Sequence, residues 1–251
     1  QYNISASVLI KEKDKKSSSQ ANALMTMSDM GMFSMTSSFD NEIEILKSRT
    51  LVKSVVTELK LYVNSYKDSK FGYDIPLYHN EPVNVYVTPE DAARFEKGAR
   101  LETTIHKNGK ISVKLEYQLG AQEFEKEYEF KELPAVITTD CGVITLTKTD
   151  LTPVQDDDYK MITTISSPVA VARSYSKNLT VAATSKLTTI ANVSLQNTVK
   201  KRGEDFINKL VEIYNKEAND EKTYTNKLNV KTRIFRAAMS NNFLIVFTRS
   251  I

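Results

Sequence analysis

The stretch from Asp40 to Leu61, DNEIEILKSRTLVKSVVTELKL, constrains the fold more than any other part of this sequence. Its apolar residues recur at the spacing of one helix face, and they are Ile45, Val52, Val55, Val56, Leu59 and Val63. Ser37 or Asp40 can cap the start, because each side chain offers an oxygen to the unpaired N–H groups of the first turn. The pattern predicts an amphipathic helix that packs on a sheet and supplies no catalytic group.

Short segments with β character dominate the middle of the chain, from Pro82 to Ile165. Within them, Asn108-Gly109 predicts a tight hairpin turn in which both central residues have positive φ. The segment EFEKEYEFK at 123–131 alternates apolar and charged residues, which is typical of a half-exposed antiparallel strand. The segment Tyr2–Ile10 reads as a buried strand, and residues 179–196 are rich in β-forming residues again.

A second long helix is predicted from about Asn197 to Asn219. Its apolar stripe consists of Val199, Gly203, Phe206, Leu210, Tyr214 and Ala218. Its first turn carries Lys200, Lys201 and Arg202, where the helix dipole does not favour cations. We interpret these three side chains as solvated.

Together these patterns predict an α+β fold, with a mixed sheet and two long helices formed from both chain ends and a β-rich inserted subdomain. The predicted base is discontinuous and comprises residues 1–80 and 166–222. Residues 81–165 form the predicted insertion, and residues 223–251 form a basic tail without acidic residues after Tyr224.

Composition narrows the functional classes. The 34 basic and 31 acidic residues nearly balance to a net charge of +3, which argues against a nucleic-acid surface. The longest apolar run, Phe243–Phe247, is far shorter than a membrane helix. A single cysteine, Cys141, permits no disulfide within the chain, which fits a reducing compartment or a periplasmic domain. No signal peptide is visible and the first residue is Gln1, so we expect a segment of a longer protein.

The sequence offers few groups for catalysis. His79 and His106 are the available imidazoles, and we interpret both as partly exposed polar residues rather than bases. Cys141 lacks a recognisable partner and reads as a small buried side chain. Asp150 and the run Asp156–Asp158 lack the glycine and the spaced glutamate of a calcium loop. Phosphate loops, dinucleotide fingerprints and zinc spacings are also missing, so we expect no enzyme activity and no cofactor.

The methionines form an unusual cluster, Met25, Met27, Met30, Met32 and Met35. Thioethers select monovalent copper, so this run is a candidate copper site. The alternative is that flexible methionines fill an irregular apolar gap or form an adaptable contact surface.

Several segments, in order, resemble the bacterial chain-length determinant family, the polysaccharide co-polymerases, which include the membrane domains of tyrosine kinases controlling capsule synthesis. Asn41–Leu61 resembles the family's first helix, and Tyr2–Ile10 its first strand. Ser167–Val181 (SPVAVARSYSKNLTV) resembles the segment before the last strands, and Ile190–Tyr214 the closing strand and long helix. The β-rich insertion resembles that of the longer, Bacteroides-type versions, whereas the tail after Tyr224 departs from the pattern.

The resemblance implies the periplasmic domain of a bacterial inner-membrane protein, anchored by flanking membrane helices. It implies a homo-oligomer that acts as a scaffold for a polysaccharide polymerase and the growing glycan, and regulates the length of capsule, exopolysaccharide or O-antigen chains. Any phosphotransfer would belong to a separate kinase domain, because this chain has no phosphate loop. No nucleic-acid partner is expected.

Oligomer contacts are expected on the exposed faces of the two helices, and the candidate residues are Lys47, Arg49, Lys53, Arg202 and Glu204. The alternative function is a carbohydrate-binding module in the β-rich insertion of a cell-surface protein. Its candidate stacking residues are Tyr86, Tyr117, Phe124 and Tyr128, although alternate aromatic residues on strands more often belong to a core.

Overall fold

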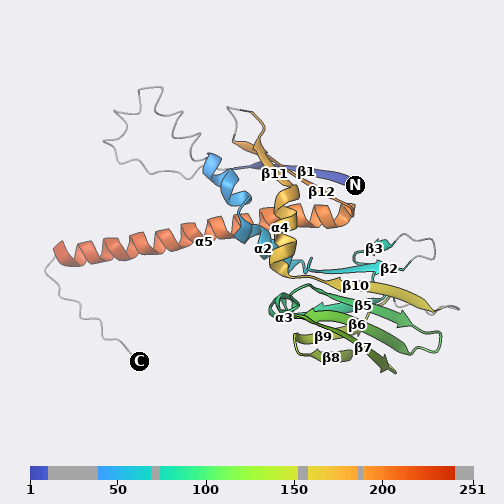
Figure 1. Cartoon of the computed structure of the whole chain (residues 1–251). Helices are drawn as coiled ribbons and strands as arrows, with labels where there is room; N and C mark the ends of the chain where they lie inside the picture. The colour runs from blue at the N-terminus through green and yellow to red at the C-terminus, as the bar shows by residue number, and fades with distance from the viewer. Residues whose placement is uncertain (11–38, 69–73, 152–157, 186–188, 241–251) are drawn as a thin grey trace.

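The computed structural model describes residues 1–10, 39–68, 74–151, 158–185 and 189–240, and its strands form three separate sheets (Figure 1). One unit, which we call the chain-end unit, is built from segments near both ends of the chain. Its sheet has the order β1 (Tyr2–Leu9), β12 (Ile190–Asn197), β11 (Leu179–Ala183). In register, Ile4 lies opposite Leu195, and Val8 lies opposite Ala191.

Two helices pack on this sheet, α4 (Pro168–Asn178) and α5 (Lys200–Ser240), and α2 (Arg49–Glu58) packs against both of these helices. Figure 1 shows α5 running along the sheet, with α2 and α4 beside it. Gly203 permits the close approach of α5 to β1, since an added Cβ would lie 2.6 Å from Ile4 Cδ1. Phe206 and Leu210 complete the buried face of the helix.

The second sheet has six strands in the order β3 (Ile75–Leu77), β2 (Val63–Lys67), β10 (Tyr159–Ile165), β5 (Ala99–Ile105), β6 (Ile111–Leu119), β7 (Gln122–Phe130). The third sheet has the order β4 (Val83–Val87), β9 (Gly142–Lys148), β8 (Ala135–Thr139).

Strict alternation of buried residues along β4, β5 and β6 gives each of these two sheets one apolar face. Both faces belong to one hydrophobic cluster, and Phe95, which follows α3 (Pro89–Arg94), meets Tyr117 of β6 edge to face at 5.6 Å. The buried Tyr62 hydroxyl donates to the Val87 carbonyl oxygen at 3.0 Å and so ties the start of β2 to β4.

The predicted α+β fold with a mixed sheet and two long helices is wrong. Strands dominate the described residues, every strand pairing among them is antiparallel, and α5 is their one long helix. The division at residues 80 and 165 stays a prediction. Of the base strands in the six-stranded sheet, β2 pairs with β10 of the predicted insertion, and β3 pairs with β2.

The opening helix breaks into two short pieces for a local reason. Residues 39–46 are helical, and Ser48 then caps α2, its hydroxyl accepting from the Leu51 N–H at 3.2 Å. Lys60, with φ of 52°, ends the helical path, and Val63 begins β2 instead of continuing the stripe. Ile45, also assigned to the stripe, is 41% exposed.

The hairpin prediction is confirmed, because β5 pairs with β6 in register around Asn108-Gly109. The predicted turn geometry is wrong. Gly109 has φ of 80°, whereas Asn108 is not among the described residues with positive φ. The Gly109 N–H donates to the His106 carbonyl, and the His106 N–H to the Lys110 carbonyl, which is the pattern of a turn closed by one left-handed glycine.

Two further strand predictions have different outcomes. The alternating segment at 123–131 is confirmed as a half-exposed antiparallel strand, β7. The segment at 2–10 is a strand, but its predicted burial is wrong, because along β1 only Val8 is fully buried.

The closing helix is longer than predicted. It continues to Ser240, beyond the predicted end at Asn219. Among the described helices, α5 included, none combines the length and apolar character that a membrane span needs.

Candidate functional site

The predicted oligomer contacts fall into two groups. Arg49 and Lys53 are exposed on α2, and Lys47 lies just before it, 3.5 Å from Glu44. Glu204 is partly exposed on α5 and pairs with Lys200 at 3.6 Å. These side chains remain candidates for contacts between subunits.

Arg202 is the exception, and its predicted place on an exposed helix face is wrong. Only 7% of it is exposed. Its Nη2 donates to the Leu77 carbonyl at 3.2 Å, and its guanidinium carbon lies 5.0 Å from the centre of the Tyr78 ring. Arg202 therefore points from α5 toward the end of β3, and it links the chain-end unit to the six-stranded sheet.

A second residue in the same turn of α5 makes the matching contacts. Asp205 accepts from the Tyr78 hydroxyl at 3.0 Å and from Lys201 at 2.8 Å, and its Oδ2 lies 3.3 Å from His79 Nε2. Burial pushes the pKa of Asp205 upward, but these three partners outweigh it and hold the pKa below its usual range. At neutral pH the Asp205 carboxylate is therefore ionised, and all three partners contact it.

This cluster borders a cavity of about 350 Å³, which we call the junction cavity. The C-terminal end of α2, the strands β2 and β4 and the first turn of α5 enclose it. Polar groups contributed by Tyr78, His79, Glu81, Asn84 and Arg202 line it, beside apolar residues such as Leu61 and Val85. The mixture of a buried cation, hydrogen-bonding groups and apolar walls is typical of a small-ligand site.

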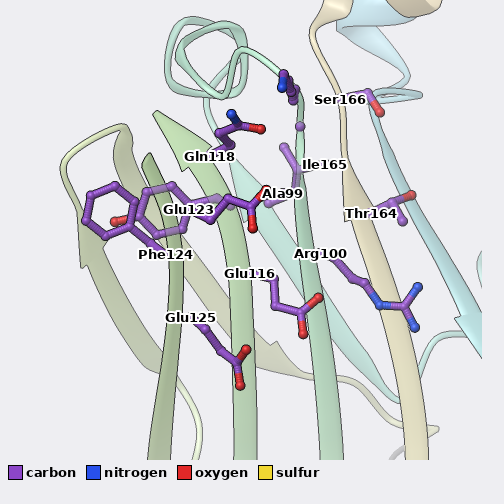
Figure 2. Close-up of a pocket in the computed structure, with 13 residues that line it drawn as sticks. Ala99, Arg100, Glu116, Gln118, Glu123, Phe124, Glu125, Thr164, Ile165 and Ser166 are labelled. Carbon is purple, nitrogen blue, oxygen red and sulfur yellow. The ribbon is translucent and has the colours of Figure 1, made fainter. Parts of the chain in front are cut away.

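A larger and shallower cavity of about 810 Å³ lies against the six-stranded sheet (Figure 2). Figure 2 shows Arg100, Glu116 and Glu125, which line this cavity from the neighbouring strands β5, β6 and β7. Lys114 bridges the two glutamates at 2.8 and 3.0 Å, and Arg100 donates to Glu102. The hydrogen bond to Glu116 is the main reason why the pKa of Lys114 is raised. The charged groups of Arg100, Glu116 and Glu125 are therefore engaged in ion pairs within the protein.

The predicted sugar-stacking residues do not form one platform. Tyr86 lies on β4, in a different sheet from the other three, and Lys60 Nζ sits 4.6 Å from its ring centre. Tyr117 is 5% exposed and stacks on Phe124 at 5.0 Å. Tyr128 stacks in turn on another β7 ring, that of Phe130. The rings of β6 and β7 therefore contribute to packing.

A hydrogen-bonded Ser-His-Asp arrangement lies at the end of the β5–β6 hairpin, and no local pattern in the sequence predicts it. His106 Nε2 lies 2.7 Å from Ser112 Oγ, and its Nδ1 lies 3.0 Å from Asp158 Oδ2. The connectivity is that of a catalytic triad. However, none of the three residues lines either cavity, and Asp158 also accepts from the Lys107 N–H. We interpret these hydrogen bonds as structural contacts that hold the β5–β6 turn against the start of β10.

The remaining candidates are the thiol of Cys141 and possible metal ligands. Cys141 is buried, as expected, and burial raises the pKa of its thiol. Within the described part of the chain, no cluster of His, Cys, Asp or Glu could hold a metal ion. The methionine run at 25–35, Asp156 and Asp157 lie outside the described residues.

No protein-family model matches the chain, and no curated protein matches its sequence.

Proposed function

We propose that this chain is the periplasmic domain of a membrane-anchored regulator of bacterial polysaccharide chain length, and that it acts as a homo-oligomeric scaffold without catalysis. The proposal combines the sequence resemblance with the way the resembling segments assemble. Its partners would be further copies of itself, a polysaccharide polymerase and the growing glycan.

One observation carries the proposal. The four segments outside the insertion that resemble the chain-length determinant family lie in the same spatial unit, although they are spread over more than 200 positions. Tyr2–Ile10 supplies β1, Asn41–Leu61 supplies α2, Ser167–Val181 supplies α4 and β11, and Ile190–Tyr214 supplies β12 and the start of α5. These elements form one sheet, the helices α4 and α5 that pack on it, and α2, which packs on both helices. An accidental likeness of separate segments would not be expected to select one contiguous unit.

The scaffold role fits the surface chemistry of that unit. Two exposed cations of this unit, Arg49 and Lys53, lie on α2. A partly exposed acid, Glu204, lies on α5, a different helix. Opposite charges on different faces of one subunit can meet between neighbours in a head-to-tail ring, where each contact joins two different surfaces.

The test is a charge-reversal experiment in cells that express the complete parent protein. Arg49→Glu combined with Lys53→Glu should weaken the contact between subunits and shift the length distribution of the polysaccharide on gels. The matched control is Lys110→Glu, an exposed lysine in the β5–β6 turn, far from α2 in the fold. Light scattering of the purified protein would report its oligomeric state.

The decisive comparison uses a strain that lacks the protein. An unchanged distribution of polymer length in that strain would sink the proposed function. A changed distribution in the deletion strain, with no effect of the double reversal, would leave the function standing and move the subunit contact elsewhere.

A further inference from the structure

The junction cavity contains a buried positive charge whose hydrogen-bonding capacity is mostly unused. The guanidinium of Arg202 offers several N–H donors in a rigid fork. Its one hydrogen bond among the described residues runs from Nη2 to the Leu77 carbonyl, and its buried Nε has no acceptor there. Arg202 also forms no ion pair within the described part of the chain.

The Asp205 carboxylate, in the same turn of α5, does not supply the missing partner. Asp205 already engages Lys201, Tyr78 and His79. Burying a charge is costly unless it is paired and hydrogen-bonded. The Arg202 guanidinium therefore lacks an anionic partner among the described residues, and it lies on the wall of the junction cavity.

The other lining groups indicate which anion would fit. Asn84 is exposed at the cavity wall, and its side-chain amide offers both a hydrogen-bond donor and an acceptor. The Glu81 carboxylate can accept hydrogen bonds from the hydroxyls of a ligand. The Tyr78 ring adds an aromatic surface beside Arg202. A volume of about 350 Å³ holds one sugar unit, whereas it is too small for an extended oligosaccharide.

We propose that the junction cavity binds one hexuronic acid unit of a polysaccharide, with its carboxylate on the Arg202 guanidinium and its hydroxyls on Asn84 and Glu81. This inference rests on the proposed function, because that function brings a glycan to the protein. A guanidinium pairs with a planar carboxylate through parallel hydrogen bonds, which distinguishes an acidic sugar from a neutral one.

The experiment is a titration of the full chain with D-glucuronate and D-galacturonate, followed by calorimetry and by NMR of the arginine side-chain N–H groups. Glucose tests the need for the carboxylate, and acetate tests the need for the sugar ring. We expect saturable binding of a uronate, weaker or absent binding of glucose and acetate, and a shifted Arg202 Nε–H resonance.

Three variants test whether the uronate binds in the junction cavity. Arg202→Gln should weaken uronate affinity about 10- to 100-fold, as for the loss of a charged hydrogen-bonding partner. Since this variant also alters the helix contact, Asn84→Asp serves as the second one. It places a negative charge at an exposed position of the cavity wall, and should weaken binding while the protein stays folded. Lys200→Gln, an exposed change in the same turn of α5, should bind like the wild type.

The inference is overturned if neither uronate binds at concentrations on the order of 50 mM. Equal binding of glucose or acetate, or unchanged uronate affinity in Asn84→Asp and Arg202→Gln, would overturn it as well. A failed titration alongside a deletion strain with altered polymer length removes the cavity ligand and leaves the proposed function intact. Arg202 would then serve only to hold α5 against β3.

Discussion

Tyr62 gives the sharpest quantitative test of the packing between α2 and the β-rich part of the chain. Its ring is 1% exposed, and its hydroxyl donates to the Val87 carbonyl oxygen at 3.0 Å. Tyr62→Phe removes the donor and leaves a buried carbonyl with one partner fewer. We expect the free energy of unfolding to fall by about 1–2 kcal/mol at pH 7.

The difference in stability between the wild type and Tyr62→Phe should change sign at high pH. Burial, assisted by the charges of Tyr86 and Glu90, raises the pKa of Tyr62 to about 12 in the folded protein, from an ordinary value of about 10. The unfolded chain therefore releases the proton first as the pH rises, and stability falls between these two values. Each pKa unit corresponds to about 1.4 kcal/mol, so the wild type loses up to about 3 kcal/mol that the phenylalanine variant keeps.

The two curves of stability against pH should consequently cross at about pH 11, where the loss from titration equals the contribution of the hydrogen bond. Urea denaturation followed by circular dichroism at pH 7, 9, 10 and 11.5 would measure both proteins. Tyr66→Phe is the matched control, because this half-buried tyrosine of β2 forms no side-chain hydrogen bond among the described residues. It should stay within about 0.5 kcal/mol of the wild type at pH 7. A constant difference between wild type and Tyr62→Phe from pH 9 to 11.5 would refute the reasoning.

Other changes test separate contacts. Gly142→Ala should destabilise the fold by about 2–4 kcal/mol, because φ is 144° and the new Cβ would clash with the Asp91 side chain. A thermal melt within about 2 °C of wild type would contradict this. Tyr214→Phe breaks the 2.8 Å bond to Glu42 and should cost about 1–2 kcal/mol, with faster hydrogen exchange in residues 39–46; protection there equal to wild type would count against it. Asp205→Asn should cost about 1.5–3 kcal/mol at pH 7. Since the folded pKa of Asp205 is lowered, this difference should shrink as the pH falls below about 4, and a pH-independent difference in urea midpoints would speak against it.

Sequence reasoning succeeded where a pattern is local. The alternation at 123–131 identified β7 because one face of that strand packs and the other is solvated. Asn108-Gly109 identified the hairpin, but only the glycine adopts positive φ, since a turn with one left-handed residue closes the same pair of strands. Helical spacing from Asp40 onward identified helix but missed the break. Ser48 has a side-chain oxygen, as Ser37 and Asp40 do, and its hydroxyl caps α2.

Long-range contacts were beyond local patterns. Arg202 looked solvated, because its partners Leu77 and Tyr78 lie about 125 positions earlier in the sequence. The bonds from His106 to Ser112 and Asp158 depend in the same way on the pairing of β5 with both β6 and β10. Neither the junction cavity nor its unpaired cation leaves a trace in composition or periodicity.

The first turn of α5 connects the proposals for the subunit contact and for the cavity. Gly203 sets the distance from α5 to β1, while Arg202 and Asp205, its neighbours in the turn, engage the end of β3 and the residues that follow it. A ligand on Arg202 at free concentration c would therefore stabilise both the junction and the placement of α5, by RT ln(1 + c/Kd) if it binds only the folded protein. Because Glu204 lies in the same turn and faces partly outward, any change in the setting of this turn also moves a candidate subunit contact. Binding of an acidic sugar and assembly of subunits would then be thermodynamically linked, so that oligomer formation should strengthen uronate binding by the same factor as uronate strengthens oligomer formation.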